Sequence, residues 1–417
     1  MRSNLSVRLL EILLLLCIAV PAVQAIEPLW TVTAPYGVDL STVAISHDGS
    51  TIIAGGTQLI EISPNGTNLW SGGSGTTVGM SQDGQYIVAS LGQNVQLYNR
   101  QGIMLWDNSL GEIVTDISIS PDAAVIVAGG GKYVQSWYNS GAGLGWNQTE
   151  TVHDIKISPV KDQIIVATAY ALRSFNLSYV PNWYDNTISP GIIALSGDGT
   201  GIVVPNGNHI RMYHGSGTLL WDRSFPGGNI ISLAYSWDGS TIVAGRDDGT
   251  VLVVDRDGNL LFTGKAGVWA TSVGVSDDGS TIATGSIDNL ICIFDRQGTL
   301  LGSYKTQDPI KSGSVAVSGN GSLIVAVDLS DVYGFSRPGL AVAVAPTAPE
   351  GAGNISTITA PGNMTPVASI PASIVPVLTS NGSVPVAGTT TASGFPWILT
   401  LVPLALLPLA RRGKIGS

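Results

Sequence analysis

The amino-acid sequence predicts an all-β protein, an eight-bladed β-propeller over residues 26–337, followed by a disordered stalk and a C-terminal hydrophobic segment. Two markers repeat in step along the chain, and Asp-Gly turns follow most copies of one of them. The spacing is that of propeller blades of roughly 40 residues. The first marker is a position on the last strand of each unit that usually holds tryptophan, and it recurs every 36 to 41 residues. Its positions are Trp30, Trp70, Trp106, Trp146, Trp183, Trp221, Phe262 and Gly302.

The second marker is an apolar–small–apolar–Ser unit that forms the first strand of each blade. It occurs eight times, ending at Ser46, Ser81, Ser120, Ser158, Ser196, Ser236, Ser276 and Ser318. Most copies continue into an Asp-Gly turn such as His47-Asp48-Gly49-Ser50, in which glycine supplies the left-handed conformation of a tight hairpin.

The remaining segments of each unit complete four short strands. After the turn comes a β-branched strand such as 241–244, then a third strand such as 251–254, a second glycine turn and the Leu-Trp strand. Four antiparallel strands in about 39 residues make one propeller blade.

The first strand has a small residue in its middle position. Innermost strands crowd around the propeller axis, so we expect the small residue to face one neighbouring blade and its large neighbours to face the other. The middle residues are Ala44, Gly79, Ser118, Lys156, Ala194, Ala234, Gly274 and Ala316. Lys156 breaks the pattern, which predicts that it faces the channel or is locally displaced.

Ring closure also follows from the order of the units. Leu29-Trp30 precedes the first innermost strand, and the last unit runs into Pro338 without a Leu-Trp strand of its own. We therefore expect Leu29-Trp30 to complete blade 8 and to remove the open sheet edge. The alternative is seven blades, if the degenerate unit 147–181, which lacks the Asp-Gly turn, does not form a blade of its own.

Both ends of the chain have the composition of targeting segments. Residues 1–25 have a basic start, a short apolar core and a small-residue ending, typical of a cleaved signal peptide; an uncleaved anchor is the alternative. Residues 338–394 hold eight prolines and no aromatic residue, which predicts an extended stalk. Residues 395–410 are uncharged and precede a basic tail, 411–417, predicted to be cytoplasmic. The uncharged segment and the basic tail together form either a membrane anchor or a sorting signal that a sortase-type enzyme cuts.

Charge and cysteine content narrow the possible partners. Between Ile26 and Ala410 the chain has 14 basic and 28 acidic residues, a net charge of −14. Such a chain cannot neutralise a phosphate backbone, so nucleic acid is excluded as a partner. Once the signal is removed, Cys292 is the only cysteine, and its strand-like surroundings predict that it is buried.

Residues 29–337 resemble the quinoprotein-like (PQQ-type) and WD40-like propeller repeats of prokaryotic surface proteins. The Ser-x-Asp-Gly-Ser turns, the stretch 244–255 and the ending 255–261 carry the resemblance. With the signal, stalk and tail, the whole chain resembles surface proteins of methanogenic archaea. The Asp-His-Ser-Trp network of WD40 blades is not evident here. The resemblance implies the fold and a surface location but no single function, because propellers serve as enzymes, scaffolds and receptors.

The residues offer little support for cofactor chemistry. One mature cysteine cannot form the vicinal disulfide typical of quinoprotein dehydrogenases, and we predict no cofactor and no catalytic or transition-metal site. His209 and His214 are five apart on a strand, hence on opposite faces. Asp247, Asp248, Asp255 and Asp257 are hairpin-turn residues by their spacing, although a structural Ca²⁺ stays possible.

Loops that lead into the first strands form the candidate ligand face, because exposed loops on a rigid scaffold are where propellers bind. The residues that start these strands are mostly small and polar, and they are expected to ring the channel mouth. They are Thr42, Thr77, Asp116, Asp154, Ile192, Ser232, Ser272 and Ser314. The candidate binding residues are Tyr36, Asp39, Glu112, Asp116, His153, Asp154, Lys156, Trp269 and Lys311.

Seven N-x-Ser/Thr sequons are compatible with glycosylation of a secreted chain. They are Asn65, Asn147, Asn176, Asn320, Asn354, Asn363 and Asn381. The expected function is binding or display of a surface protein or glycan, with the propeller extracellular and no catalysis. Two alternatives stay open: a propeller hydrolase or lyase that acts on surface glycans, and a structural component of the cell envelope.

Overall fold

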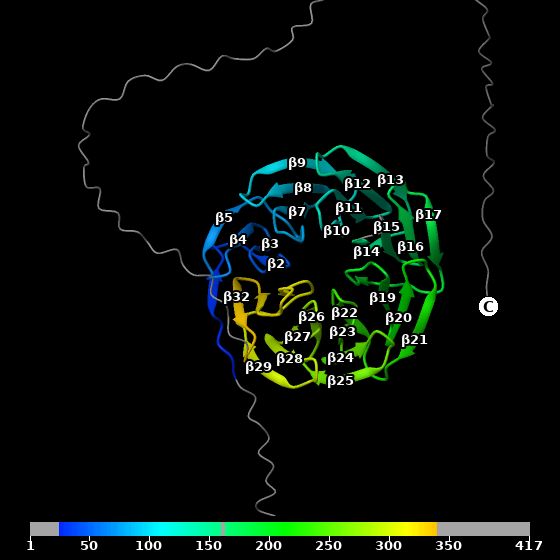
Figure 1. Ribbon diagram of the computed structural model, residues 1–417. Helices are drawn as coiled ribbons and strands as arrows, with labels where there is room; N and C mark the ends of the chain where they lie inside the picture. The colour runs from blue at the N-terminus through cyan, green and yellow to red at the C-terminus, as the bar shows by residue number, and fades with distance from the viewer. Residues whose placement is uncertain (1–24, 160–162, 340–417) are drawn as a thin grey trace, which may run out of the picture. The chain divides into compact units, whose positions relative to one another are not determined.

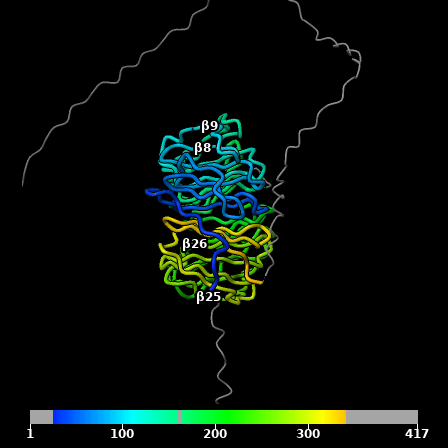
Figure 2. Tube along the Cα trace, turned by 90° about the vertical axis from the view of Figure 1, so that its left-hand side faces the viewer, coloured from blue at the N-terminus to red at the C-terminus, as the bar shows by residue number. Residues whose placement is uncertain are grey.

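A computed structural model of the chain describes residues 25–159 and 163–339. In these residues, eight four-stranded antiparallel sheets stand around a central axis (Figure 1). Turned on its side, the ring is a short, thick disc (Figure 2). The prediction of eight blades is confirmed, and the seven-bladed alternative is excluded because the degenerate unit forms a complete blade 4.

Blade 1 comprises β2 (Leu40–Ile45), β3 (Ile52–Gly56), β4 (Leu59–Ile62) and β5 (Asn68–Gly72). Blade 2 comprises β6 (Thr77–Met80), β7 (Tyr86–Leu91), β8 (Asn94–Asn99) and β9 (Met104–Ser109). Blade 3 comprises β10 (Asp116–Ile119), β11 (Val125–Gly130), β12 (Tyr133–Tyr138) and β13 (Gly143–Gln148). Blade 4 comprises β14 (Val152–Ile157), β15 (Gln163–Thr168), β16 (Leu172–Asn176) and β17 (Pro181–Asp185).

Blade 5 comprises β18 (Ala194–Leu195), β19 (Gly201–Asn206), β20 (His209–His214) and β21 (Leu219–Ser224). Blade 6 comprises β22 (Ile230–Tyr235), β23 (Thr241–Arg246), β24 (Thr250–Asp255) and β25 (Leu260–Lys265). Blade 7 comprises β26 (Ala270–Val275), β27 (Thr281–Ser286), β28 (Leu290–Asp295) and β29 (Leu300–Lys305). Blade 8 comprises β30 (Val315–Val317), β31 (Leu323–Val327), β32 (Asp331–Ser336) and β1 (Trp30–Thr33).

Blade 8 closes the ring with the first strand of the chain. β1 pairs antiparallel with β32, with Trp30 opposite Gly334. This confirms the predicted seam. The chain before β1 also lies against blade 7, where the amide of Ile26 donates to the carbonyl of Ser303 at 3.0 Å.

The innermost strands pack as their alternation predicts. Val43 and Ile45 pack into the cluster shared by blades 8 and 1, whereas Ala44 packs into the cluster shared by blades 1 and 2. The second strand of each blade is covered on both faces, so strands such as β11 are buried along their whole length. Cys292, on β28, is buried as predicted, and burial raises the pKa of its thiol to about 12.

The turn between the first and second strands, which we call the inner turn, is held by one repeated pattern. In blade 6 the Ser236 hydroxyl donates to the Asp238 carboxylate at 2.7 Å, and that carboxylate accepts the amide of Ser240 at 2.8 Å. Burial alone would raise the pKa of Asp238, but these hydrogen bonds lower it. The aspartates of these turns therefore serve structure.

Backbone hydrogen bonds at the inner turns also link neighbouring blades. The residue after the marker serine donates most of them: the amide of His47 donates to the carbonyl of Gln82 at 3.0 Å, and the amide of Gln82 donates to the carbonyl of Pro121 at 3.0 Å. In blade 6 the donor is the next residue, Asp238, whose amide donates to the carbonyl of Asp277 at 2.9 Å. Among the described residues, such bonds connect neighbouring blades at six of the eight junctions. Both missing bonds flank blade 4, because Pro121 and Pro159 have no N–H to donate.

The aromatic series of the outermost strands is confirmed as blade packing. Each ring covers the positive-φ glycine in the turn between the third and fourth strands of the next blade. Trp221, for example, covers Gly258 and donates its indole N–H to the carbonyl of Arg256 at 2.9 Å. The exception is Trp146, which is 63% exposed. Tyr179 replaces the glycine in that turn, at φ 58°, and its own ring packs there against Phe175.

The predicted signal (1–25, except Ala25), most of the stalk, the hydrophobic segment 395–410 and the tail 411–417 lie outside the described residues. The part of the chain that the structure describes contains no helix of the length and apolarity needed to cross a membrane.

Candidate functional site

A cavity of about 440 Å³ occupies the propeller axis and opens among the inner turns. Its wall is formed by apolar residues at the ends of the innermost strands, including Ile45, Met80 and Leu195. It reaches Lys156, near the end of β14, so of the two predicted alternatives the structure shows the one in which this lysine faces the channel. A ligand of this cavity would meet a hydrocarbon wall with polar groups at its two ends.

The mouth of this cavity is formed by the residue that follows each marker serine. Side chains from three blades meet there: the imidazole Nε2 of His47 lies 3.0 Å from the Asp277 carboxylate, and the His47 and Trp237 rings contact edge to face at 5.9 Å between centroids. We call His47, Trp237 and Asp277 the mouth cluster. Its members come from blades 1, 6 and 7, and blade 8 lies between blades 7 and 1 in the ring.

Two glycines at the same repeat position create the space for the mouth cluster. Gly319, on blade 8, lies beside Asp277, and a Cβ there would come within 2.5 Å of the carboxylate. A Cβ at Gly197 would come within 2.2 Å of the Trp237 ring. The missing side chains on blades 8 and 5 therefore allow His47 to reach Asp277 and the Trp237 ring to lie against Gly197.

Asp277 differs electrostatically from the turn aspartates. Burial raises the pKa of its carboxyl, and the nearby Asp278 and Asp238 raise it further, against the attraction of His47. Among the described residues, no serine or backbone amide donates to Asp277, whereas Asp278 accepts both. Asp277 is thus an aspartate whose carboxylate is available at the mouth.

An ion cluster lies deeper in the channel, between blades 3 and 4. The Lys156 ammonium is 2.7 Å from the Asp116 carboxylate and 2.5 Å from the Asp154 carboxylate. Asp116 also accepts the amide of Ile155 at 3.2 Å, and Asp154 accepts the amide of Ile193 at 2.6 Å. The cluster therefore joins blade 4 to both of its neighbours.

One lysine balances only one of these two carboxylates. Burial raises the pKa of Asp116 to about 8, and repulsion from Asp154 adds to this effect. Burial also acts on Asp154, but the attraction of Lys156 and hydrogen bonds lower its pKa. Burial and the neighbouring carboxylate therefore make Asp116 the member of the pair that is more readily protonated.

The other predicted binding residues are spread around the opposite face of the disc, which carries the connecting loops between blades. All six are exposed: Tyr36, Asp39, Glu112, His153, Trp269 and Lys311. The structure brings Asp116, Asp154 and Lys156 together but does not gather these six into one site. The small polar residues that start the innermost strands are mostly buried, contrary to the expectation that they ring the mouth. They bond to the next blade, as when the Ser232 hydroxyl donates to the carbonyl of Ala270 at 2.7 Å.

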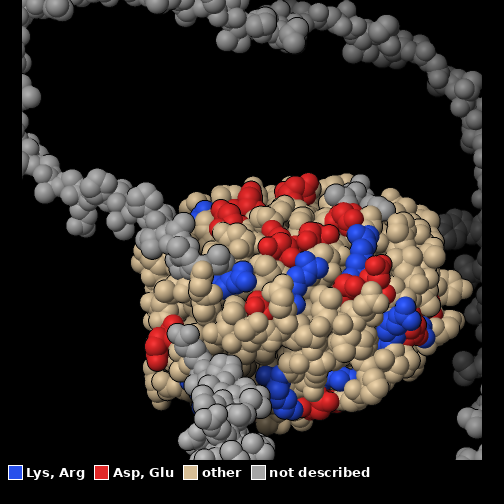
Figure 3. Space-filling model, turned by 60° about the horizontal axis from the view of Figure 1, so that its bottom comes forward, with Lys and Arg blue, Asp and Glu red and all other residues tan. Residues whose placement is uncertain are grey.

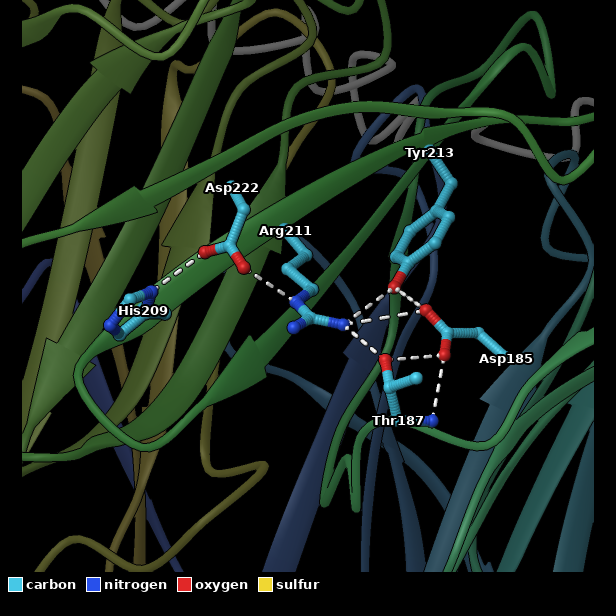
Figure 4. A network of polar contacts seen from close by, with 6 residues as sticks. All are labelled: Asp185, Thr187, His209, Arg211, Tyr213 and Asp222. Carbon is cyan, nitrogen blue, oxygen red and sulfur yellow. Dashed lines mark hydrogen bonds and ion pairs between the residues drawn. The ribbon is translucent and has the colours of Figure 1, made fainter.

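A polar network on the outer strands joins blades 4 and 5 (Figure 4). Arg211 lies at its centre, with its Nε 2.8 Å from Asp222 and its Nη1 3.4 Å from Asp185. The Tyr213 hydroxyl donates to Asp185 at 2.6 Å, and His209 pairs with Asp222 at 2.7 Å. Every polar side chain of this network is engaged within it, so we read it as a clamp between blades.

Metal chemistry finds no support in the described residues, where no group of three or more His, Cys, Asp or Glu side chains is arranged to hold an ion. Asp255 accepts the amides of Asp257 and Asn259, and Asp248 accepts those of Gly228 and Thr250. These carboxylates serve turns, as their spacing predicts. Acidic and basic side chains lie in small groups among a larger uncharged surface on the side shown in Figure 3.

Four sequons lie in the described residues. Asn65 and Asn320 are exposed, and Asn147 and Asn176 are half-buried. Asn320 also takes the place of the turn aspartate in blade 8, where it accepts the Ser318 hydroxyl at 2.9 Å. The remaining sequons, Asn354, Asn363 and Asn381, lie outside the described residues, and glycosylation stays a prediction for all seven.

Sequence reasoning missed the mouth cluster. The available signal was the position after the marker serine, which holds His, Gln, Pro, Pro, Gly, Trp, Asp and Gly in blades 1 to 8. The geometry of the turn requires the serine before this position and most of the residues after it. The side chain at this position varies from blade to blade, which indicates that the turn does not require a particular residue there.

Comparison with known proteins agrees with the geometry. The family described as WD domain, G-beta repeat, matches residues 222–255 and 258–295. The C-terminal WD40 domain of Sif2 is similar with a TM-score of 0.66 at 16% identity, over 76% of this chain and all of that one. Sqt1 from Chaetomium thermophilum, solved bound to the N-terminus of the ribosomal protein L10, is similar with a TM-score of 0.60 at 15% identity, over 72% of this chain and 97% of that one. A search of curated proteins gives no match. The chain therefore contains WD40 repeats within an eight-bladed β-propeller.

Proposed function

We propose that this propeller is a non-enzymatic module that binds a protein at the cell surface through its connecting-loop face. WD40 propellers are typically protein-interaction scaffolds, and Sqt1, solved with the N-terminus of a ribosomal protein, is one example. The expected signal (1–25), stalk (338–394) and hydrophobic segment (395–410) support the surface location. PQQ-type chemistry and an archaeal origin rest on resemblance alone.

The observation that carries this proposal is an apolar patch on blade 7. Val268, Trp269 and Ile287 are 55%, 49% and 36% exposed. The amide of Ile287 donates to the carbonyl of Trp269 at 3.3 Å, so the two loops that carry the patch touch. The patch stands on loops fixed by a rigid sheet, and a contiguous exposed apolar surface of this kind is typical of protein interfaces.

The enzyme alternative depends on a reactive carboxylate pair in the channel. Asp116 and Asp154 do face inward, but Lys156 bonds to both of them and backbone amides of neighbouring blades take further oxygen sites. The oxygens of these two carboxylates are therefore already bonded in contacts that hold blade 4. This favours a binding role over cleavage of glycans by a hydrolase or a lyase.

Site-specific photocrosslinking in intact cells tests the proposal. A benzophenone amino acid at Trp269 of the full-length chain should give a crosslinked product with one protein, identified by mass spectrometry. The matched control is the same amino acid at Leu220, which is 50% exposed on the outer strand β21. Equal labelling from both positions would contradict binding through this face. A product with a second copy of the chain would favour an envelope component, and a glycan product would favour glycan binding.

The location has its own test. Protease added to intact cells should release a soluble propeller fragment by cutting the expected stalk, because its composition predicts an extended segment and such segments are preferred sites of cleavage. Protection in intact cells together with cleavage after lysis would show that the propeller is not exposed at the surface.

A further inference from the structure

We propose that the axial cavity at the inner-turn mouth binds a small organic ammonium ion with a hydrocarbon stem. This site is separate from the connecting-loop face and does not depend on the function proposed for that face. The cavity volume of about 440 Å³ lies within the range of small-molecule pockets. The chemistry of its two parts, mouth and wall, indicates the class of ligand.

The mouth is suited to a positive charge. Asp277 presents a carboxylate with only His47 as a side-chain partner among the described residues, and its side chain is 33% exposed. Asp238 and Asp278 lie close enough to raise the pKa of Asp277, so the local field is negative. An ammonium beside Asp277 would relieve this repulsion.

Trp237 supplies the second feature for a cation. Trp237 is 38% exposed and lines the cavity, and its ring lies against Gly197. Cations bind well against tryptophan rings, and quaternary ammonium groups do so without the loss of a tight hydration shell. The edge-to-face contact with His47 holds the ring beside the Asp277 carboxylate.

The wall beyond the mouth is suited to a hydrocarbon stem. Ile45, Met80, Ile119, Leu195 and Val317 line it, and all five are only partly covered by protein. A stem that enters the cavity would cover this apolar surface while the charged end stays at the mouth. At the far end, Lys156 is already bonded to two carboxylates, so a second cation gains nothing there.

Calorimetric titration of the purified full-length chain with hexyltrimethylammonium, far below micelle formation, tests the site. We expect one ion to bind per chain, and hexyl sulfate of the same length not to bind. Asp277→Asn, which keeps the side-chain shape, and Trp237→Leu should each weaken binding about tenfold. The matched controls are Asp257→Asn on an outer turn and Trp146→Leu on the rim, which should leave affinity unchanged.

Three results would overturn the proposal: no heat of binding from the unmodified chain, equal binding of hexyl sulfate, or equal weakening by the control variants. Thermal unfolding of every variant separates loss of the site from loss of the fold. If Trp237→Leu unfolds, Asp277→Asn still decides the outcome because it removes one charge without removing volume.

Discussion

Blade 6 and blade 4 have the same four strands but are joined to their neighbours by different forces. In blade 6 the inner turn holds a Ser-Asp hydrogen bond, backbone bonds link it to blades 5 and 7, and Phe262 packs over the turn of blade 7. In blade 4 the turn motif is absent, and prolines remove the backbone bonds on both sides. Charged side chains take their place there.

The difference shows that the propeller fold does not need every repeat to be complete. Lys156 ties blade 4 to blade 3, and Arg211 of blade 5 holds Asp185 of blade 4. Trp183 stacks on Tyr213 of blade 5 with 6.0 Å between ring centroids. Ion pairs respond to pH and to loss of one partner, whereas backbone bonds do not. Blade 4 should therefore be the part of the ring that is most sensitive to single changes of charge.

Lys156→Met should have the largest effect. Its ammonium is the only cation bonded to Asp116 and Asp154 among the described residues. Removing one partner of a buried ion group leaves a charge without compensation, which costs about 3 kcal/mol of unfolding free energy. Urea denaturation of the purified chain measures it.

The control for this variant removes all the charges together. Lys156→Met combined with Asp116→Asn and Asp154→Asn should recover most of the lost stability, because the amides keep the backbone hydrogen bonds without a buried charge. If the single variant unfolds at the same urea concentration as the unmodified chain, the ion cluster does not hold blade 4.

The two tryptophans that precede these blades give the next comparison. Trp221 docks on the turn of blade 6, while Trp146 is displaced from the turn of blade 4 by Tyr179. We expect Trp221→Ala to cost about 2–3 kcal/mol, because it leaves a cavity between blades, and Trp146→Ala to cost less than about 1 kcal/mol. Equal losses in thermal unfolding experiments would show that the rim contact is not what distinguishes the two junctions.

The periodic features of the molecule were predictable from the sequence, and the exceptions were not. Repeat spacing predicts eight blades, the seam at Trp30 and the packing of the aromatic series, because each rests on a contact that recurs at every junction. The mouth cluster joins His47 to Asp277 across blade 8, and this depends on the absence of a side chain at Gly319. Such a contact follows from ring closure and from one local gap, neither of which a repeat pattern encodes.

The pH dependence of stability should also distinguish blade 4. Burial raises the pKa of Asp116 from 3.8 to about 8. Between these values the folded chain binds a proton that the unfolded chain releases, so the contribution is present at low pH and is lost as pH rises through 8. One extra bound proton changes the unfolding free energy by about 1.4 kcal/mol per pH unit. From about pH 6 to about pH 8, Asp116→Asn should therefore remove about 2 kcal/mol of this loss.

Urea denaturation at several pH values measures this slope, with Asp257→Asn as the control for removal of a surface charge. Asp238 of blade 6 has a lowered pKa and so contributes only toward the acid end. An unchanged slope in Asp116→Asn would mean that Asp116 is ionised throughout this range.

The smallest effect is expected at the blade 6 turn itself. Asp238→Ala removes the acceptor of the Ser236 hydroxyl and of the Ser240 amide on an exposed turn, which should cost about 1 kcal/mol in thermal unfolding. Asp238→Asn should cost clearly less, because Asn320 already fills this role in blade 8 and accepts the same two donors at 2.9 and 3.0 Å. If the asparagine variant is as unstable as the alanine variant, the negative charge holds the turn. Charge would then stabilise blade 6 as it stabilises blade 4, and the contrast between the two blades would not stand.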